Sequence, residues 1–268
     1  MLHKQLVFRD AQIAYYIEEN KDKETILMLH PAFADHQMFE AQVDELKEQY
    51  QLILFDMPGH GASQVNGSKV TLRDMPEIIN QLMAEHQIPV VHLLGVSMGS
   101  IVAQAFADRY PDRVQSVTIV GGYSIHKANE RVLKAQQKEG LRWLWYILFS
   151  MNKFREHVIS SSCYSDRCRE VFRRGIQTFN RRSFSAMAGM NSFFRPKESP
   201  VPYPLLIITG KHDLNTIQEA ALTWHQVEAH SQFVSLPDAG HCANLDAPVE
   251  FNKILQDFLA TNASLIHS

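Results

Sequence analysis

The chain has 268 residues, of which 45% are hydrophobic and 21% are charged. This length and composition suffice for the core of one large domain, or of a domain with an insertion. The 26 Lys and Arg residues nearly balance the 29 Asp and Glu residues, so the net charge is −3, and no basic block or acidic tail stands out. Binding to nucleic acid is therefore not expected.

The N-terminus, MLHKQLVFRD, lacks a basic head followed by a long apolar run, so no signal or transit peptide is predicted and a cytoplasmic location is expected. The densest apolar stretch, residues 143–149, falls well short of the roughly 20 residues that span a bilayer, and it is predicted to form a buried helix. The three cysteines, Cys163, Cys168 and Cys242, form no CxxC pair and no zinc-like spacing. Neither a disulfide framework nor a structural metal is expected.

Short β-rich runs alternate with helical patterns along most of the chain, which predicts a mostly parallel sheet covered by helices on both faces. The first two runs are close enough for an antiparallel hairpin, and the later ones leave room for crossover helices. The eight predicted strands are residues 5–8, 13–17, 25–29, 51–55, 90–94, 114–120, 204–209 and 232–236.

Between residues 122 and 200 the pattern changes to long helical segments rich in Arg, Lys, Trp and Phe, with no strong strand. The proline-rich stretch RPKESPVPYP (195–204) would end any helix before the seventh strand begins. We therefore expect an α/β core formed by residues 1–121 and 201–268, with a helical cap inserted at residues 122–200.

The stretch GVSMG (95–99) places a serine between two glycines, after a predicted strand and before a helical pattern. A tight strand-to-helix turn leaves no space for side chains two residues before and after the serine, and glycine removes that collision. Such a turn presents the serine hydroxyl at the carboxyl end of the sheet. Ser97 is therefore predicted to be a nucleophile.

Four motifs, in this order, resemble those of the α/β-hydrolase superfamily. They are LHPAF (29–33), DMPGHGAS (56–63), GVSMG (95–99), and GKHD (210–213) together with AGHCANLDAP (239–248). The resemblance covers nearly the whole chain except the predicted cap, and the combination is far more specific than any single motif. It implies an α/β-hydrolase fold of the cap-bearing serine esterase or lactonase type.

A serine hydroxyl is a weak nucleophile unless a base takes its proton and a third group orients that base. The resemblance implies that His241 is the base and that Asp213, after the seventh strand, is the orienting acid. The order Ser, Asp, His is that of this superfamily. In some relatives the acid follows the sixth strand, but here that position reads GGYS (121–124) and has no carboxylate.

The resemblance also assigns the oxyanion hole to the backbone N–H groups of Ala32 and Met98. The family usually has His-Gly in the first of these loops, whereas this chain has His30-Pro31. Proline has no N–H, but the expected donor belongs to the next residue, so the hole can survive. Asp56 and His60 are expected to brace the neighbouring loop rather than to take part in catalysis.

A serine at the elbow disfavours the dehalogenases and epoxide hydrolases of this fold, which use aspartate there. Carbon-carbon bond hydrolases keep the serine, but they commonly have tryptophan directly after the catalytic histidine, where this chain has Cys242. The sequence therefore favours hydrolysis of a small carboxylic ester or lactone through an acyl-enzyme, with no cofactor or metal. A carbon-carbon bond hydrolase, a thioesterase, a cofactor-free perhydrolase and a non-catalytic ligand-binding protein stay open as alternatives, as does an oligomer.

Aromatic residues of the predicted cap suggest an apolar roof over the serine. Trp143, Tyr146 and Phe149, together with Phe33 in the oxyanion loop, are candidate substrate-binding residues. Packing of the cap helices against one another explains these aromatics equally well.

Overall fold

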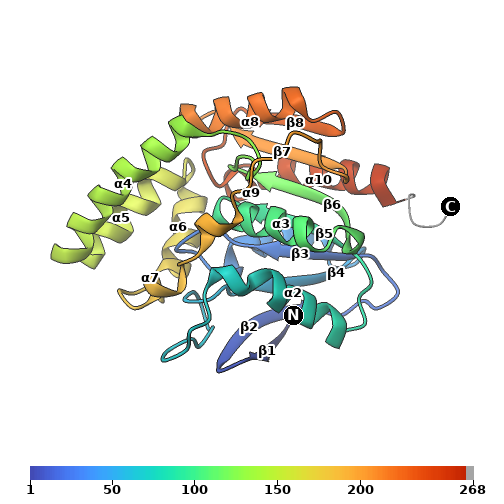
Figure 1. The fold of residues 1–268 in the computed structure, drawn as a ribbon, viewed down its shortest axis with the longest axis horizontal. Coiled ribbons are helices and arrows are strands. Elements are labelled where there is room, and N and C mark those ends of the chain that lie inside the picture. The colour runs from blue at the N-terminus through green and yellow to red at the C-terminus, as the bar shows by residue number, and fades with distance from the viewer. Residues whose placement is uncertain (264–268) are drawn as a thin grey trace.

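The computed structural model describes residues 1–263, which form an eight-stranded sheet with helices on both faces (Figure 1). The order of the strands is β1-β2-β4-β3-β5-β6-β7-β8, and only the β1–β2 and β2–β4 pairs are antiparallel. The strands are β1 (Leu2–Phe8), β2 (Ala11–Glu18), β3 (Thr25–Leu29), β4 (Gln51–Phe55), β5 (Val91–Val96), β6 (Val114–Val120), β7 (Leu205–Gly210) and β8 (Ser231–Leu236). All eight predicted strands are confirmed.

We group the α-helices by the boundaries that we proposed for the cap, residues 122–200. The core helices are α1 (Glu40–Leu46), α2 (Met75–Glu85), α3 (Met98–Arg109), α8 (Asn215–Val227), α9 (Ala243–Asp246) and α10 (Pro248–Ala263). The cap helices are α4 (Glu130–Phe149), α5 (Met151–Ser162), α6 (Asp166–Ile176) and α7 (Ser183–Ala186). Short 3₁₀ helices are η1 (His36–Phe39), η2 (Leu72–Asp74), η3 (Pro111–Arg113) and η4 (Met190–Phe193).

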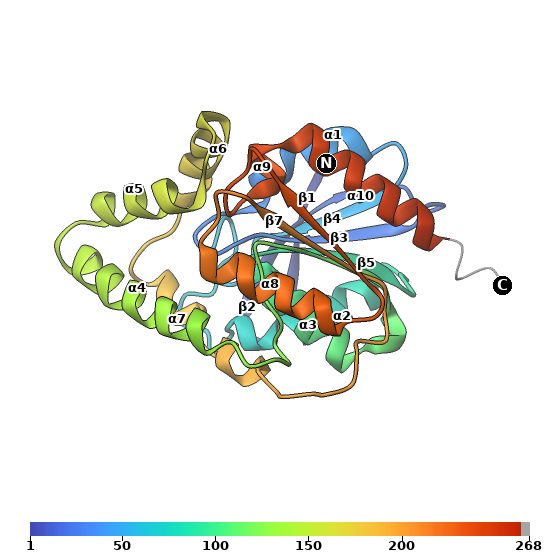
Figure 2. The ribbon, with the colours of Figure 1, turned by 90° about the horizontal axis from the view of Figure 1, so that it is seen from above.

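The sheet is the middle layer of the core. Figure 2 shows α1 and α10 on one face and α2, α3 and α8 on the other. The central strands β3, β4, β5 and β7 are buried along their whole length. Parallel strands covered on both faces read as continuous apolar runs rather than alternating ones, which is why these segments could be recognised in the sequence.

Helices α4 to α7 and η4 lie between β6 and β7, in the region where we expected the cap. Helices α4 and α5 project away from the sheet (Figures 1 and 2). The expectation that residues 143–149 form a buried helix is wrong for one face of α4. Trp143 and Tyr146 pack inward, but Trp145 is 65% exposed and Phe149 is 73% exposed. A long helix at the surface buries only one stripe, however apolar its sequence is.

The expectation for the cysteines also needs a correction, because a disulfide joins Cys163 to Cys168. Helix α5 ends at Ser162 and α6 begins at Asp166, so the turn between the two helices brings the two Cα atoms to 5.4 Å from each other. That separation is within the usual range for a disulfide. The spacing of the cysteines did not predict this disulfide, because only the turn between α5 and α6 brings the two residues together. Cys242 is buried and has a free thiol.

Candidate active site

Ser97 lies at the strained turn between β5 and α3. Its backbone has φ 50° and ψ −111°, in a region that a residue with a side chain seldom adopts. A Cβ atom on Gly95 would collide with the backbone of Gly99, and one on Gly99 would collide with the carbonyl oxygen of Leu29. The two glycines are thus required by the close approach of β3, β5 and α3, as the sequence predicted.

The structure brings together the three residues predicted to form the catalytic triad. His241 Nε2 lies 2.8 Å from Ser97 Oγ, and His241 Nδ1 lies 2.9 and 3.0 Å from the two carboxylate oxygens of Asp213. The side chain of Asp213 is fully buried and also accepts the Leu214 N–H at 2.7 Å. A carboxylate on Nδ1 favours the tautomer in which Nε2 can accept the serine proton.

The charge of Asp213 also changes the acidity of His241. Burial disfavours the imidazolium, but the negative charge of Asp213 and its hydrogen bond outweigh that effect and raise the pKa of His241 above its ordinary value. The His241 side chain keeps 18% of its surface exposed. The pair can therefore take up and return a proton near neutral pH.

The proposed oxyanion loop is held by His30. His30 Nδ1 lies 2.7 Å from the Pro31 carbonyl oxygen, and His30 Nε2 accepts the Met57 N–H at 2.9 Å. Burial lowers the pKa of His30, which keeps the ring neutral and able to make both contacts. Within residues 1–263, the Ala32 N–H has no hydrogen-bond acceptor. Although Pro31 itself has no N–H, the N–H of the next residue, Ala32, is therefore available as a donor.

The second donor expected in the oxyanion hole is the N–H of Met98, the first residue of α3. The first N–H groups of a helix have no carbonyl four residues earlier to bind and point toward the positive end of the helix dipole. Ala32 and Met98 follow the adjacent strands β3 and β5. Both residues therefore follow the carboxyl ends of neighbouring parallel strands, the edge of the sheet at which Ser97 also lies.

Comparison with known proteins shows where this arrangement belongs. A family model of the α/β-hydrolase fold matches residues 24–146. The chain therefore has the α/β-hydrolase fold. The esterase of Thermogutta terrifontis has a TM-score of 0.79 at 22% identity, covering 97% of this chain and 99% of that structure.

Two sequence relatives of this chain are similar to it over most of their length. The (E)-2-((N-methylformamido)methylene)succinate hydrolase of Acinetobacter baylyi is 24% identical, over 97% of this chain and 99% of the relative. The 2-hydroxy-6-oxononadienedioate/2-hydroxy-6-oxononatrienedioate hydrolase of Klebsiella pneumoniae is 27% identical, over 89% of this chain and 88% of the relative.

Asp56 and His60, in the DMPGHGAS motif, have the structural roles we expected. The Asp56 carboxylate accepts hydrogen bonds from the N–H groups of His36 and Ala62 and from the Tyr16 hydroxyl, and it also pairs with the His36 ring. His60 is buried, and burial lowers its pKa to about 3, so it stays neutral at any physiological pH. Neither residue contacts Ser97 or His241 through a hydrogen bond in the described chain.

Sequence reasoning missed Gly121, the residue directly after β6. It has φ 56°, and a Cβ atom there would lie 2.5 Å from the His241 carbonyl oxygen and 3.0 Å from Nδ1. Any side chain would displace the base. In the sequence, GGYS indicates only that no carboxylate follows the sixth strand, whereas in the structure its first glycine makes room for His241.

Asp246 was also missed, although it lies in the AGHCANLDAP motif. Its carboxylate accepts the Gly240 N–H at 2.9 Å, directly before His241, and the Ser165 N–H at 2.7 Å in the loop between α5 and α6. It also accepts the Ser165 hydroxyl and the Tyr164 N–H. One carboxylate therefore ties the cap to the loop that carries the base.

The four predicted substrate-binding residues do not form one cluster. Phe33 is buried and makes edge-to-face contacts with Trp143, Phe154 and Phe179, which come from three segments of the cap. Tyr146 packs against the same apolar cluster and also contacts the His157 ring. The prediction for Phe149 is wrong, because it lies at the exposed end of α4. An aromatic residue in a run could not be assigned to the inner or outer face without the helix phase.

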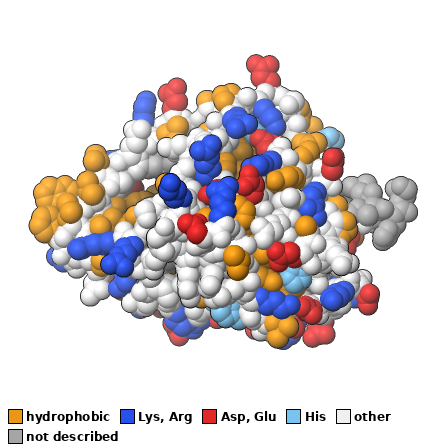
Figure 3. Space-filling view, turned by 60° about the horizontal axis from the view of Figure 1, so that its bottom comes forward, with side chains coloured by type: hydrophobic (Ala, Val, Ile, Leu, Met, Phe, Trp, Pro, Cys, Tyr) orange, Lys and Arg blue, Asp and Glu red, His pale blue; other side chains and the backbone are white. Residues whose placement is uncertain are grey.

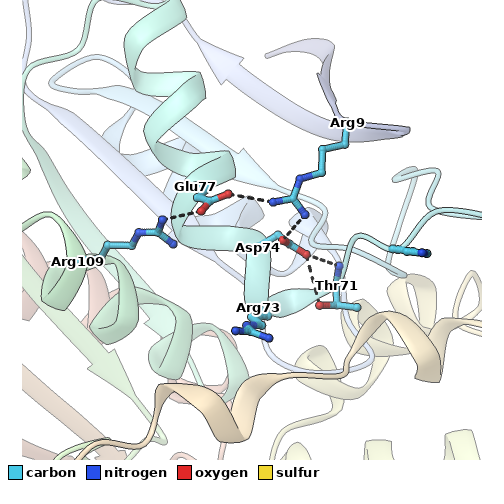
Figure 4. Close-up of a pocket in the computed structure, with 7 residues that line it drawn as sticks. Arg9, Thr71, Arg73, Asp74, Glu77 and Arg109 are labelled. Atoms are coloured by element: carbon cyan, nitrogen blue, oxygen red, sulfur yellow. Dashed lines mark hydrogen bonds and ion pairs between the residues drawn. The ribbon is translucent and has the colours of Figure 1, made fainter.

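A cavity of about 540 Å³ lies apart from the triad, lined by residues of the β1–β2 turn, η2, α2 and α3 (Figure 4). Its lining has four cationic side chains, those of Arg9, Lys69, Arg73 and Arg109, and two carboxylates, those of Asp74 and Glu77. Glu77 accepts hydrogen bonds from Arg9 and Arg109, and Asp74 accepts one from Arg9. Thr71 and Asp74 form a capping box at the start of η2. This cavity contains no paired nucleophile and base, and its ion pairs connect the first hairpin to α2 and α3.

Proposed function

We propose that this α/β hydrolase is a serine hydrolase that cleaves a small carboxylic ester or lactone. The observation that carries the proposal is the continuous set of hydrogen bonds from Ser97 Oγ through His241 to the buried Asp213 carboxylate. Nucleophile, base and orienting acid are within hydrogen-bond distance of one another, and the strained turn presents the nucleophile.

In this mechanism Ser97 Oγ attacks the carbonyl carbon while its proton passes to His241 Nε2. The N–H groups of Ala32 and Met98 stabilise the negative charge that develops on the carbonyl oxygen. His241 then returns the proton to the leaving alcohol, and the acyl group remains on Ser97. A water molecule, deprotonated by His241, attacks the acyl-enzyme and releases the acid, which regenerates the serine.

The aromatic cluster around Phe33 supports a small or aromatic acyl group. Phe33 follows the oxyanion loop directly and is enclosed by Trp143, Phe154, Phe179 and Phe184. These rings provide an apolar boundary next to the proposed oxyanion hole and leave little room for a long chain on that side.

Carbon-carbon bond hydrolysis is the second candidate, because the relative from Klebsiella pneumoniae has a name that describes a 2-hydroxy-6-oxo dienedioate substrate. The same triad could serve that reaction. Cys242 argues against it, since it stands where such enzymes commonly have tryptophan, and its side chain is completely buried.

The test is hydrolysis of p-nitrophenyl esters of increasing acyl length, with γ- and δ-lactones and a 2-hydroxy-6-oxo dienoate alongside. Wild type is compared with Ser97→Ala and with Ser160→Ala, which removes an exposed serine of the cap. We expect turnover of short esters or lactones that Ser97→Ala abolishes and Ser160→Ala leaves intact. Turnover of the dienoate alone would favour the second candidate. Ester turnover that survives in Ser97→Ala, or that a chelator abolishes, would contradict the serine mechanism.

A further inference from the structure

The outer face of α4 is a large apolar surface. Five of its side chains recur at helical spacing, and each has more than half of its surface exposed: Leu141 (67%), Leu144 (53%), Trp145 (65%), Leu148 (62%) and Phe149 (73%). The Trp145 and Phe149 rings stack on each other, with centroids 5.3 Å apart. Exposed apolar patches of this kind mark interaction sites. These five residues are called the outer face below.

The outer face is separate from the contacts that hold the cap together. Trp143, Tyr146 and Ile147, on the other side of α4, pack against the neighbouring apolar cluster, and Trp143 contacts Phe33. The helix is therefore already anchored through its inner face. The outer face is not needed to attach α4 to the protein, and it is free to bind something else.

Cations surround the outer face. Lys138 and Arg142 are exposed in the middle of α4, three residues before Leu141 and Trp145, and Lys153 is exposed in the first turn of α5. The Arg181 guanidinium donates to the Ile147 and Leu148 carbonyl oxygens, which places another positive charge at the C-terminal end of α4. Glu139 neutralises only part of this charge, through its contacts with Arg142 and His157.

The whole cap region shares this sign. Residues 122–200 contain 15 Lys and Arg and 6 Asp and Glu, a net charge of +9. The rest of the chain contains 11 Lys and Arg and 23 Asp and Glu, a net charge of −12. The nearly neutral total therefore hides two regions of opposite charge, and the cationic one carries the outer face. In Figure 3, hydrophobic side chains gather at the end of the molecule where the α4–α5 hairpin projects, with Lys and Arg side chains beside them.

We propose that the outer face docks onto an anionic lipid surface. Leu, Trp and Phe on one helix face can enter the boundary between headgroups and acyl chains, while adjacent Lys and Arg bind the phosphates. A second copy of this chain is a poorer occupant, because a symmetric pairing of outer faces would bring two +9 caps together. Among residues 1–263, none of the helices has the length and apolar character of a membrane span.

Docking in this orientation involves the helix whose inner face lies against Phe33. The substrate side of the proposed site and the lipid side of the cap are thus opposite faces of α4. Lipid binding is independent of the reaction that the site performs, and its test needs no substrate.

The test is co-sedimentation of the full chain with vesicles of phosphatidylglycerol and, separately, of phosphatidylcholine. We expect binding to phosphatidylglycerol that weakens as salt is raised, and much less binding to phosphatidylcholine. The triple variant Leu144→Ser/Trp145→Ser/Phe149→Ser should bind the anionic vesicles about tenfold more weakly or worse. A matched control, Val7→Ser/Val227→Ser/Val249→Ser, changes three exposed apolar residues of the core and should bind as wild type does.

A second variant tests the charges. Lys138→Gln/Lys153→Gln should weaken binding to phosphatidylglycerol and reduce its salt dependence, with the fold checked by circular dichroism. Failure of the wild type to bind anionic vesicles would overturn the proposal, as would binding that the outer-face variant leaves unchanged. A dimer in analytical ultracentrifugation that only the outer-face variant dissociates would identify a second copy as the occupant instead.

Discussion

The core supplies all three side chains of the proposed triad, each from a loop at the carboxyl end of a strand, whereas the cap supplies aromatic rings, cations and one loop held by Asp246. Ser97 lies in a strained backbone conformation, and the buried carboxylate of Asp213 orients His241. Glycines beside Ser97 and His241 let the backbone approach so closely that no side chain would fit in their place. Many cap side chains are exposed, and each of the five residues on the outer face of α4 has more than half of its surface exposed.

This difference separates two tasks. The geometry of bond cleavage requires atoms placed within a few tenths of an ångström, which a sheet and its tight turns provide. Selecting a substrate or a surface depends on charge and apolar area, which a helical hairpin can vary with little cost to the core. Substitutions in the core should therefore have steep effects on chemistry or stability, and comparable substitutions in the cap should have shallow ones.

Asp213→Asn should have the largest effect on catalysis. The neutral amide cannot stabilise the imidazolium and favours the wrong tautomer, so we expect kcat to fall by about 10³ to 10⁴-fold with little change in Tm. The control is Asp238→Asn, an exposed acid three residues before His241. Steady-state kinetics on the best ester distinguishes the two variants. A fully active Asp213→Asn would mean that another group orients the base.

A pair of Gly→Ala substitutions compares the two regions for stability. In Gly99→Ala the new methyl group would collide with the Leu29 carbonyl oxygen, so we expect a loss of about 3 kcal/mol or more in the free energy of unfolding. In Gly140→Ala, within α4, the methyl group meets nothing within 4 Å, and alanine should stabilise the helix by up to about 1 kcal/mol. Urea denaturation measures both. Equal losses at the two positions would contradict the contrast between core and cap.

Asp246→Asn tests the one carboxylate that joins the two regions. An amide can still accept hydrogen bonds through its oxygen, but its NH₂ group would face N–H donors from either the cap loop or Gly240. We expect kcat/KM to fall by roughly 10-fold, mostly through kcat, because the His241 loop loses its support. Asp166→Asn, at a fully exposed cap acid, should have no effect. A change in KM alone would show that Asp246 positions only the cap.

The division between core and cap also describes which features could be predicted from the sequence. The strands and the elbow glycines could be predicted, because local sterics dictate them, and the family resemblance indicated the three residues of the proposed triad, which the structure brings within hydrogen-bond distance of one another. The inward or outward direction of Phe149, the Cys163–Cys168 bond and the role of Asp246 depend on how helices pack in space. Gly121 is an intermediate case. Its positive φ suits glycine, but only the folded chain shows that His241 occupies the space that a side chain at this position would need.

The smallest predicted effect is a shift in the pH dependence of turnover. His241 must be neutral to accept the proton of Ser97, so activity rises as pH passes through its pKa. Asp213 raises that pKa, and the midpoint of kcat/KM should therefore lie above 6.5, the ordinary value for histidine. In Asp213→Asn the raising charge is gone and burial remains, so the midpoint of the residual activity should move below that of the wild type. Within the described part of the chain, His241 forms an ion pair with Asp213 and with no residue of the cap, so neutralising Lys138 and Lys153 should leave the midpoint in place. A midpoint that followed the cap charges would show that the cationic cap sets the potential at the base, and the two regions would then share the control of catalysis.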